Sequence, residues 1–437
     1  MRRVPAPSRV LWVVALLVVA GGCSPDAAPP DLATESAGGP SVGAGPGGSA
    51  APGLGGPELA WGDGSAVTPI VMSLEAAERA QAGTDFQEMQ TVPGIEGGRA
   101  FVALALEPSG TVVVGAGPPD NYDSTTGTLR ESMVVGEYVD QEFRAFAPTP
   151  AVGGDVLARQ VYSGSSSGGV TAWAETASTD LYYSNWRVFA RSAQGTVRLV
   201  ARSEEVQEGQ LPIVEGDTAP VVSGGRVYLA TAAPADLVGT YRKDVVSRAA
   251  DGTGPLVTEA RGASRPAVQD GPLYVVRDSW SDPDVPEGEV QIERVASPGT
   301  PEVVLRLTGA GGSAVTGMVA SGSRLAFTLF AREGGPSALY VVDPEARRVW
   351  VVPTDNAGTS DAVAFCGDLV TWNGADGSGL VSSPQYVYDV GRGELLAIDV
   401  AHNYGGSKCA GTMIAWGELD TSKEERARTV VVAWLRR

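Results

Sequence analysis

The chain has 437 residues and a mass of 44.9 kDa, with 43% hydrophobic residues, 57 Gly and 30 Pro. This hydrophobic content is ordinary for a folded protein, and so many Gly and Pro residues are typical of turn-dense β-structure. The 51 acidic against 32 basic side chains give a net charge of −19, which repels nucleic acid and anionic lipid headgroups and excludes both as partners of the folded surface.

Residues 1–22 predict a lipoprotein signal peptide. Three arginines lie within the first nine residues, residues 10–19 form an apolar run too short to span a bilayer, and Ala20-Gly21-Gly22 precedes Cys23. Small residues directly before a cysteine resemble a bacterial lipobox, and the resemblance implies that Cys23 becomes the lipidated first residue of the mature chain. We therefore expect a lipid anchor at the extracytoplasmic face of the cell membrane. The alternative is an ordinary signal peptide with an incidental cysteine.

Residues 23–57 predict a disordered linker between this anchor and the folded domain. The segment consists mainly of Gly, Pro, Ala and Ser and has almost no large apolar residue. A flexible chain of this length reaches roughly 30 Å. The domain that follows, residues 58–437, should therefore stand clear of the membrane surface.

The folded domain begins with two short apolar runs, Glu58–Trp61 and Val67–Met72, and a predicted helix over 74–82 that Ser73 would cap. A turn glycine followed by a β-branched or aromatic run then recurs seven times, at spacings of 58, 57, 46, 51, 45 and 44 residues. These seven glycines are Gly110, Gly168, Gly225, Gly271, Gly322, Gly367 and Gly411. Each of the first six units contains four such runs, which predicts a four-stranded antiparallel sheet.

Seven small sheets in series resemble a β-propeller, of the TolB-like or WD-repeat-like architecture, over residues 58–437. The resemblance rests on the repeat period and the strand pattern, so it implies an all-β fold and carries no functional residue onto this chain. The terminal units leave six or eight blades as alternatives to seven. A β-helix and a pair of β-sandwiches are the alternative folds.

The seventh unit lacks a fourth run, so its sheet needs a strand from elsewhere. Propellers commonly repair such an edge with a strand from the other end of the chain. The best candidate in the sequence is Val67–Met72, with Glu58–Trp61 behind it.

The two cysteines of the folded domain, Cys366 and Cys409, are 43 residues apart, which is almost one repeat. Both end the first strand of a unit, the sixth and the seventh. Equivalent positions on neighbouring inner strands face each other around the channel, and export makes oxidation permissible. The sequence therefore predicts a disulfide between them, with two buried free thiols as the alternative.

No cluster of nucleophile, base and acid stands out, so we assign no catalytic residue from the sequence. The chain has one histidine, His402, which together with the lipidation of Cys23 makes an ordinary zinc site close to excluded. Gly164-Ser-Ser-Ser-Gly168 has the letters of a nucleophile elbow, but it lies between two predicted strands and is interpreted as a hairpin loop.

Two segments are candidate ligand-binding loops. Tyr182, Tyr183 and Trp186 supply aromatic rings of the kind that stack on sugars, with packing between blades as the alternative. Trp280, Asp282 and Asp284 lie in an acidic loop. Its oxygens leave calcium as the one cofactor to consider, although the spacing fits no known calcium loop and solvated carboxylates are the simpler interpretation.

These observations lead to a functional prediction with one alternative. We expect a membrane-anchored scaffold that uses one propeller face to bind a protein, a peptide or a cell-wall glycan, without catalysis. The alternative is a carbohydrate-active hydrolase or lyase that uses a pair of Asp or Glu side chains at the central channel. Carboxylates converging on that channel would favour the alternative.

Overall fold

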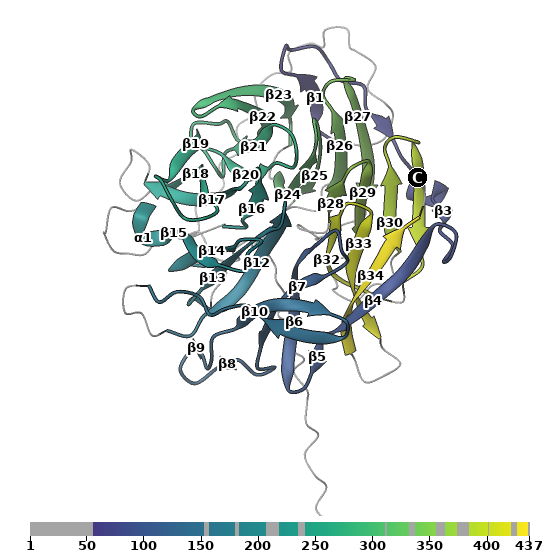
Figure 1. Cartoon of the computed structure of the whole chain (residues 1–437). Coiled ribbons are helices and arrows are strands. Elements are labelled where there is room, and N and C mark those ends of the chain that lie inside the picture. The colour runs from purple at the N-terminus through teal and green to yellow at the C-terminus, as the bar shows by residue number, and fades with distance from the viewer. Residues whose placement is uncertain are drawn as a thin grey trace, which may run out of the picture.

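The repeated runs form seven antiparallel sheets that stand like blades around a common centre (Figure 1). The computed structural model describes residues 56–435 apart from 153–156, 180–182, 207–217, 235–240, 311–312, 332–336, 355–362, 374–383, 401 and 421–425. Cys23, Tyr182, the signal peptide and almost all of the linker therefore lie outside the described residues. The fold is a seven-bladed β-propeller.

Blades 1 to 3 follow one another in the sequence. Blade 1 contains β6 (Arg99–Leu106), β7 (Val112–Gly117), β10 (Val134–Val139) and β11 (Glu142–Ala145), with β5 (Ile95–Glu96) beside β6 and a small hairpin, β8 (Tyr122–Asp123) and β9 (Thr128–Leu129), before β10. Blade 2 contains β12 (Gln160–Ser167), β13 (Val170–Thr176), β14 (Trp186–Arg191) and β15 (Val197–Arg202), and the short helix α1 (Ser203–Val206) follows it. Blade 3 contains β16 (Val221–Ser223), β17 (Arg226–Pro234), β18 (Tyr241–Ala249) and β19 (Val257–Arg261).

Blades 4 to 7 repeat the same order. Blade 4 contains β20 (Ser264–Ala267), β21 (Leu273–Asp278), β22 (Glu289–Ser297) and β23 (Thr300–Thr308), and blade 5 contains β24 (Ser313–Ser321), β25 (Arg324–Ala331), β26 (Ser337–Asp343) and β27 (Arg348–Thr354). Blade 6 contains β28 (Ala364–Cys366), β29 (Leu369–Asn373), β30 (Gln385–Asp389) and β31 (Glu394–Ile398). Blade 7 contains β32 (Asn403–Ala410), β33 (Met413–Asp420), β34 (Arg426–Trp434) and β4 (Phe86–Pro93).

The N-terminal strand β4 closes the ring. It pairs antiparallel with β34, from Phe86 opposite Trp434 to Pro93 opposite Arg428. Closure by an N-terminal segment was predicted correctly, but the predicted segment, Val67–Met72, was wrong. An outermost strand buries only one side, so its hydrophobicity is low, and β4 is mostly exposed except for Val92. The more apolar run was therefore a poor guide to the closing strand.

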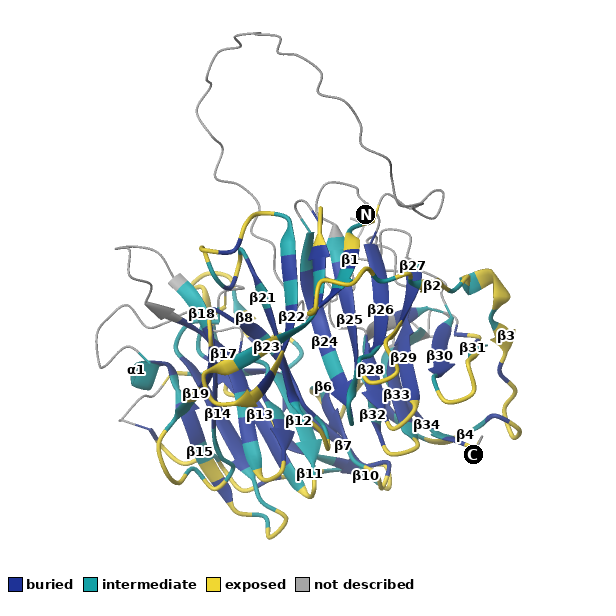
Figure 2. Cartoon of the chain, turned by 90° about the horizontal axis from the view of Figure 1, so that it is seen from above, coloured by how far each residue is buried: buried dark blue, intermediate teal, exposed yellow. Residues whose placement is uncertain are grey.

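The segment before β4 runs around the rim of the propeller. β1 (Glu58–Trp61) adds to β23 of blade 4, β2 (Ile70–Val71) pairs parallel with β27 of blade 5, and β3 (Glu78–Arg79) pairs parallel with β31 of blade 6. Figure 2 shows much of the stretch between β2 and β4 as exposed. We call residues 58–85 the rim segment.

The predicted helix over 74–82 is not formed. Ser73 does cap a turn, since its hydroxyl accepts a hydrogen bond from the Glu75 amide at 3.3 Å, but only the 3₁₀ turn η1 (Leu74–Ala76) follows. None of its residues is buried. An isolated helix of this length is marginal without a packed face, and pairing of β3 with blade 6 competes for the same residues.

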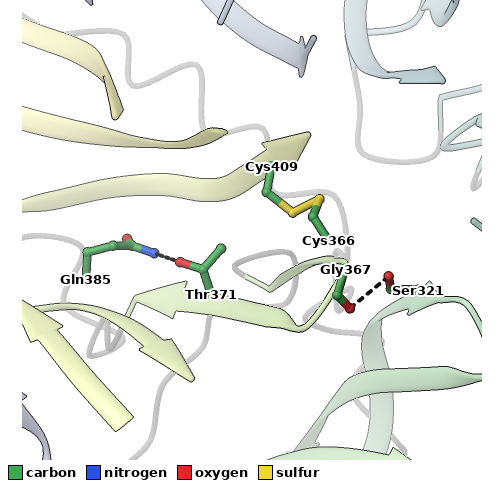
Figure 3. The surroundings of a disulfide bond; sticks show 6 residues. All are labelled: Ser321, Cys366, Gly367, Thr371, Gln385 and Cys409. Atoms are coloured by element: carbon green, nitrogen blue, oxygen red, sulfur yellow. Dashed lines mark hydrogen bonds between the residues drawn. A yellow bond between two sulfur atoms is a disulfide. The ribbon is translucent and has the colours of Figure 1, made fainter. Parts of the chain in front are cut away.

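The disulfide prediction is confirmed (Figure 3). Cys366 on β28 and Cys409 on β32 are joined, with their Cα atoms 6.0 Å apart. The bond links the first strands of blades 6 and 7 and thereby ties the last complete blade to the blade that needs β4.

Antiparallel strands place the connections at two faces. We call the face with the turns from first to second and from third to fourth strand the turn face, and the other the loop face. Neighbouring turns approach closely at the turn face: a Cβ on Gly271 would lie 2.0 Å from the Gly322 carbonyl oxygen, so only glycine fits there. Six of the seven repeat glycines instead have a positive φ, which explains their recurrence in the sequence.

Candidate active site

Within the described residues, the innermost strands of the blades do not carry the carboxylate pair expected by the alternative prediction. The first strands of the seven blades, β6, β12, β16, β20, β24, β28 and β32, contain no Asp or Glu. On β5, which borders β6, Glu96 accepts a hydrogen bond from the Tyr138 hydroxyl at 3.0 Å. A pair of carboxylates must therefore be sought away from these strands.

Two glutamates meet at the turn-face end of the boundary between blades 1 and 2. Glu107 follows β6 and begins the turn to β7, while Glu137 lies on β10. Across the boundary, Arg191 of β14 places its Nη1 atom 2.8 Å from Glu137 Oε1. Thr171 of β13 forms a hydrogen bond with the Glu107 side chain. We call Glu107, Glu137, Thr171 and Arg191 the carboxylate-pair site.

The two glutamates of this site differ in their surroundings. Burial raises the pKa of Glu107 above its ordinary value, and the negative charge of Glu137 raises it further, whereas Arg191 and the bond with Thr171 lower it by less. Glu137 is ion-paired with Arg191. One carboxyl is thus held toward its protonated form beside a second carboxyl that is ion-paired with an arginine, which is an arrangement suited to acid–base chemistry.

The opposite, loop-face end of the same boundary holds a different buried glutamate. Glu175 is almost fully buried, and burial raises its pKa, while Arg159 and Arg187 and a hydrogen bond from the Trp173 indole (2.8 Å) lower it by less. The pKa of Glu107 is raised in part by a second carboxylate, whereas no carboxylate contributes to the raised pKa of Glu175. Glu175 is best explained as a structural charge.

An aromatic ring and hydroxyl groups border the carboxylate-pair site. The Arg191 guanidinium lies 4.2 Å from the ring centre of Phe146, which fixes its orientation. Ser166 Oγ lies 2.9 Å from Thr171 Oγ1. Ser166 belongs to the serine-rich run that was expected to be a hairpin loop, but the structure places it in β12. The single histidine of the chain, His402, precedes β32 in blade 7, so no imidazole activates this serine.

The predicted ligand-binding residues are not gathered at one place. Trp186 is fully buried with Val188 and Leu229 between blades 2 and 3, so its ring is not available to stack on a ligand. Tyr183 stacks on Tyr162 with 4.2 Å between ring centres. Trp186 thus follows the alternative interpretation, packing between blades, whereas ligand binding by Tyr183 stays a prediction.

The acidic loop of blade 4 lies on the loop face, away from the carboxylate-pair site. Trp280 is half exposed, and its amide donates to Asp278. Asp282 is not a solvated carboxylate, because Arg277 Nη1 lies 2.6 Å from its Oδ2, whereas Asp284 is exposed. Within the described residues, no three His, Cys, Asp or Glu side chains are grouped so that they could hold a metal ion. Ligand binding and calcium binding by this loop stay predictions.

Sequence analysis missed the carboxylate-pair site because its members come from four strands or turns. A usable signal was present nevertheless. Glu137 and Arg191 lie on the third strands of successive units and are 54 residues apart, close to one repeat. A spacing of about one repeat also predicted the disulfide. The same spacing between charged residues would have predicted that Glu137 lies beside Arg191.

Comparison with known proteins finds solved structures with a similar fold. No family model and no curated protein matches the sequence. A Mycobacterium tuberculosis puromycin-hydrolyzing peptidase has a similar structure, with 13% identity, a TM-score of 0.45 and coverage of 85% of this chain and 56% of the peptidase. A structure from a study of two prolyl endopeptidases has 12% identity and a TM-score of 0.48, covering 79% of this chain and 47% of its own. An oligogalacturonate lyase from Vibrio parahaemolyticus has 8% identity and a TM-score of 0.43, covering 80% and 98%.

The prediction of a non-catalytic scaffold, and with it the expectation that the chain is not an enzyme, was wrong. The structures with a similar fold come from peptidases and a lyase. The missing His, Cys and Ser cluster excludes only nucleophilic triads, and it leaves acid–base chemistry by carboxylates open. This chain spans about half the length of the peptidases, and at such identities the likeness shows the fold alone, so no residue is transferred from them.

Within the described residues, no helix is long and apolar enough to cross a membrane.

Proposed function

We propose that this chain is a hydrolytic enzyme that cleaves glycosidic bonds at the carboxylate-pair site. The observation that carries the proposal is the pairing of Glu107, whose pKa is raised by burial and by its neighbour, with Glu137, whose carboxylate is ion-paired to Arg191 at 2.8 Å. Glycoside hydrolysis needs a protonated carboxyl for the leaving oxygen and an ionised carboxylate for the other side of the bond.

In this mechanism Glu107 is the general acid. Its raised pKa keeps a proton on the carboxyl at a pH where an ordinary glutamate has lost it, and the proton passes to the glycosidic oxygen as the bond to the sugar carbon breaks. Glu137 either attacks the sugar carbon or takes a proton from the attacking water. Arg191 forms an ion pair with Glu137 and, stacked on Phe146, holds it in place.

Glutamine variants of the purified mature protein test this proposal on a panel of cell-wall and plant polysaccharides. Reducing ends are measured for hydrolysis, ultraviolet absorbance of unsaturated products for elimination, and peptide substrates for peptide cleavage. We expect reducing ends without unsaturated products, and a loss of about 10²-fold or more in Glu107→Gln and Glu137→Gln.

The matched control is Glu142→Gln, an exposed glutamate on β11 of the same blade, which should keep its activity. Equal rates in all three variants and the wild type would contradict the assignment. Unsaturated products or cleaved peptides in place of new reducing ends would contradict the reaction class.

We also propose that the enzyme is exported and acts at the extracytoplasmic face of the membrane, anchored by a lipid on Cys23. The support is the basic start, the short apolar run and the small residues before Cys23. A glycan-cleaving site on such a chain would face cell-wall polymers. In Cys23→Ala, we expect the protein in the soluble fraction or as an uncleaved precursor, checked by fractionation and intact mass. Membrane-bound protein of wild-type mass would contradict the anchor.

A further inference from the structure

The closing strand β4 contacts the backbone of both segments that carry the carboxylate pair. Gln90 of β4 donates a hydrogen bond from Nε2 to the Gly110 carbonyl at 2.6 Å, and Nε2 also lies 3.5 Å from the Tyr138 carbonyl oxygen. Gly110 ends the turn that Glu107 begins, and Tyr138 follows Glu137 directly. One amide group therefore spans the two segments from a strand of another blade.

The turn that bears Glu107 is otherwise held by few bonds of its own. The Gly110 amide donates to the Glu107 carbonyl at 2.8 Å, and the Glu107 amide donates to the Thr111 carbonyl at 2.9 Å. Both bonds close the turn on itself, and the backbone pairing of β7 with β10, from Val112 opposite Tyr138, holds the strand that follows it. The side chain of Gln90 adds a second link between the turn and β10, and this link comes from another blade.

We propose that Gln90 is a positioning residue that braces the Glu107 turn against β10, so that docking of the N-terminal strand completes the alignment of Glu107 with Glu137. This inference rests on the proposed function for its meaning in catalysis. The structural part of the inference does not depend on the proposed function, because it concerns only how Glu107 is positioned relative to Glu137. A chain in which β4 is not docked would keep the pairing of β7 with β10 but lack this brace.

The test is the titration of Glu107 in Gln90→Met, which keeps the length of the side chain and removes its donor. Carboxyl carbons of glutamate are followed by NMR as the pH is varied, in the full mature chain. Without this brace we expect the turn to be held less firmly and Glu107 to be more accessible to water. We therefore expect the half-titration pH of Glu107 to fall toward that of an ordinary glutamate. The control is Gln87→Met, an exposed glutamine on the same strand.

A fall in Gln90→Met with no change in Gln87→Met supports the inference. An unchanged titration in folded Gln90→Met overturns it, and so does an equal fall in both variants, because that would reflect general loosening of β4. If Gln90→Met does not fold, Gln90→Asn, which keeps a shorter donor, is titrated in its place against the same criteria.

The catalytic consequence is measured separately. In Gln90→Met we expect kcat/KM on the cleaved glycan to fall by about tenfold to a hundredfold, with the alkaline limb of its pH profile moved to lower pH. If the wild-type protein cleaves no glycan, the proposed function is contradicted. The NMR titration would still test the role of Gln90.

Discussion

The ring has two arcs that are held together differently. Around blades 4 to 6 the rim segment adds a strand to each outer edge, β4 completes blade 7, and a disulfide joins blades 6 and 7. Around blades 1 to 3 the outermost described strands are β11, β15 and β19, with nothing from the rim segment on them. Glu107 and Glu175, two carboxyl groups with a raised pKa, lie in this second arc.

The cross-links that stabilise the fold and the side chains proposed for catalysis therefore lie in different arcs of the ring. Burying an ionisable group destabilises a protein unless the group is paired, and a site that holds one carboxyl beside another is therefore a cost in folding free energy. The arc of blades 4 to 7 carries cross-links that offset such a cost without touching the site. Gln90 on β4 is the point where the two arcs meet, since β4 belongs to blade 7 and its side chain reaches blade 1.

The largest expected effect comes from removing the disulfide. In the double variant Cys366→Ser and Cys409→Ser, we expect the free energy of unfolding to fall by about 4 kcal/mol on the chain-entropy model, because the 43-residue separation no longer closes a loop in the unfolded chain. Urea denaturation measures this. Because the disulfide and Glu107 lie in different arcs, we expect the titration of Glu107 to stay unchanged. A shifted titration in the folded variant would show that the two arcs are not independent.

A smaller and pH-dependent effect is expected from Glu107→Gln. The pKa of Glu107 is raised on folding, so the wild type loses stability as the pH rises through the folded pKa, where the buried carboxyl must ionise beside Glu137. Glutamine carries no proton to lose. The variant should therefore be more stable than the wild type above the folded pKa, and this difference should vanish below the unfolded pKa of about 4.3.

Thermal unfolding across this pH range measures the difference between the Glu107→Gln variant and the wild type. Glu142→Gln is the control, and its difference from the wild type should not follow this pH dependence. A Glu107→Gln variant less stable than the wild type at neutral pH would show that Glu107 is a structural charge like Glu175. Glu107 and Glu175, at the two ends of the boundary between blades 1 and 2, would then have the same role.

The sequence by itself determined the architecture and one cross-link. Turn glycines such as Gly168 and Gly367 recur because six of the seven blades need a left-handed glycine at the same place in the turn, and this local requirement leaves a period that can be counted. Cys366 and Cys409 were predictable by the same period, since one repeat in sequence is one step around the ring.

Only the tertiary structure decided which strand closes the ring, where the rim segment lies and which charges meet. Apart from Val92, the residues of β4 are exposed or half-buried, so apolar content did not identify β4 as the closing strand in preference to Val67–Met72. Its role follows from its pairing with β34. Trp186 is buried because it lies between blades 2 and 3. Glu107 and Glu137 share no motif, because their proximity arises from strands packed side by side and from a neighbouring blade, which residue order does not encode locally.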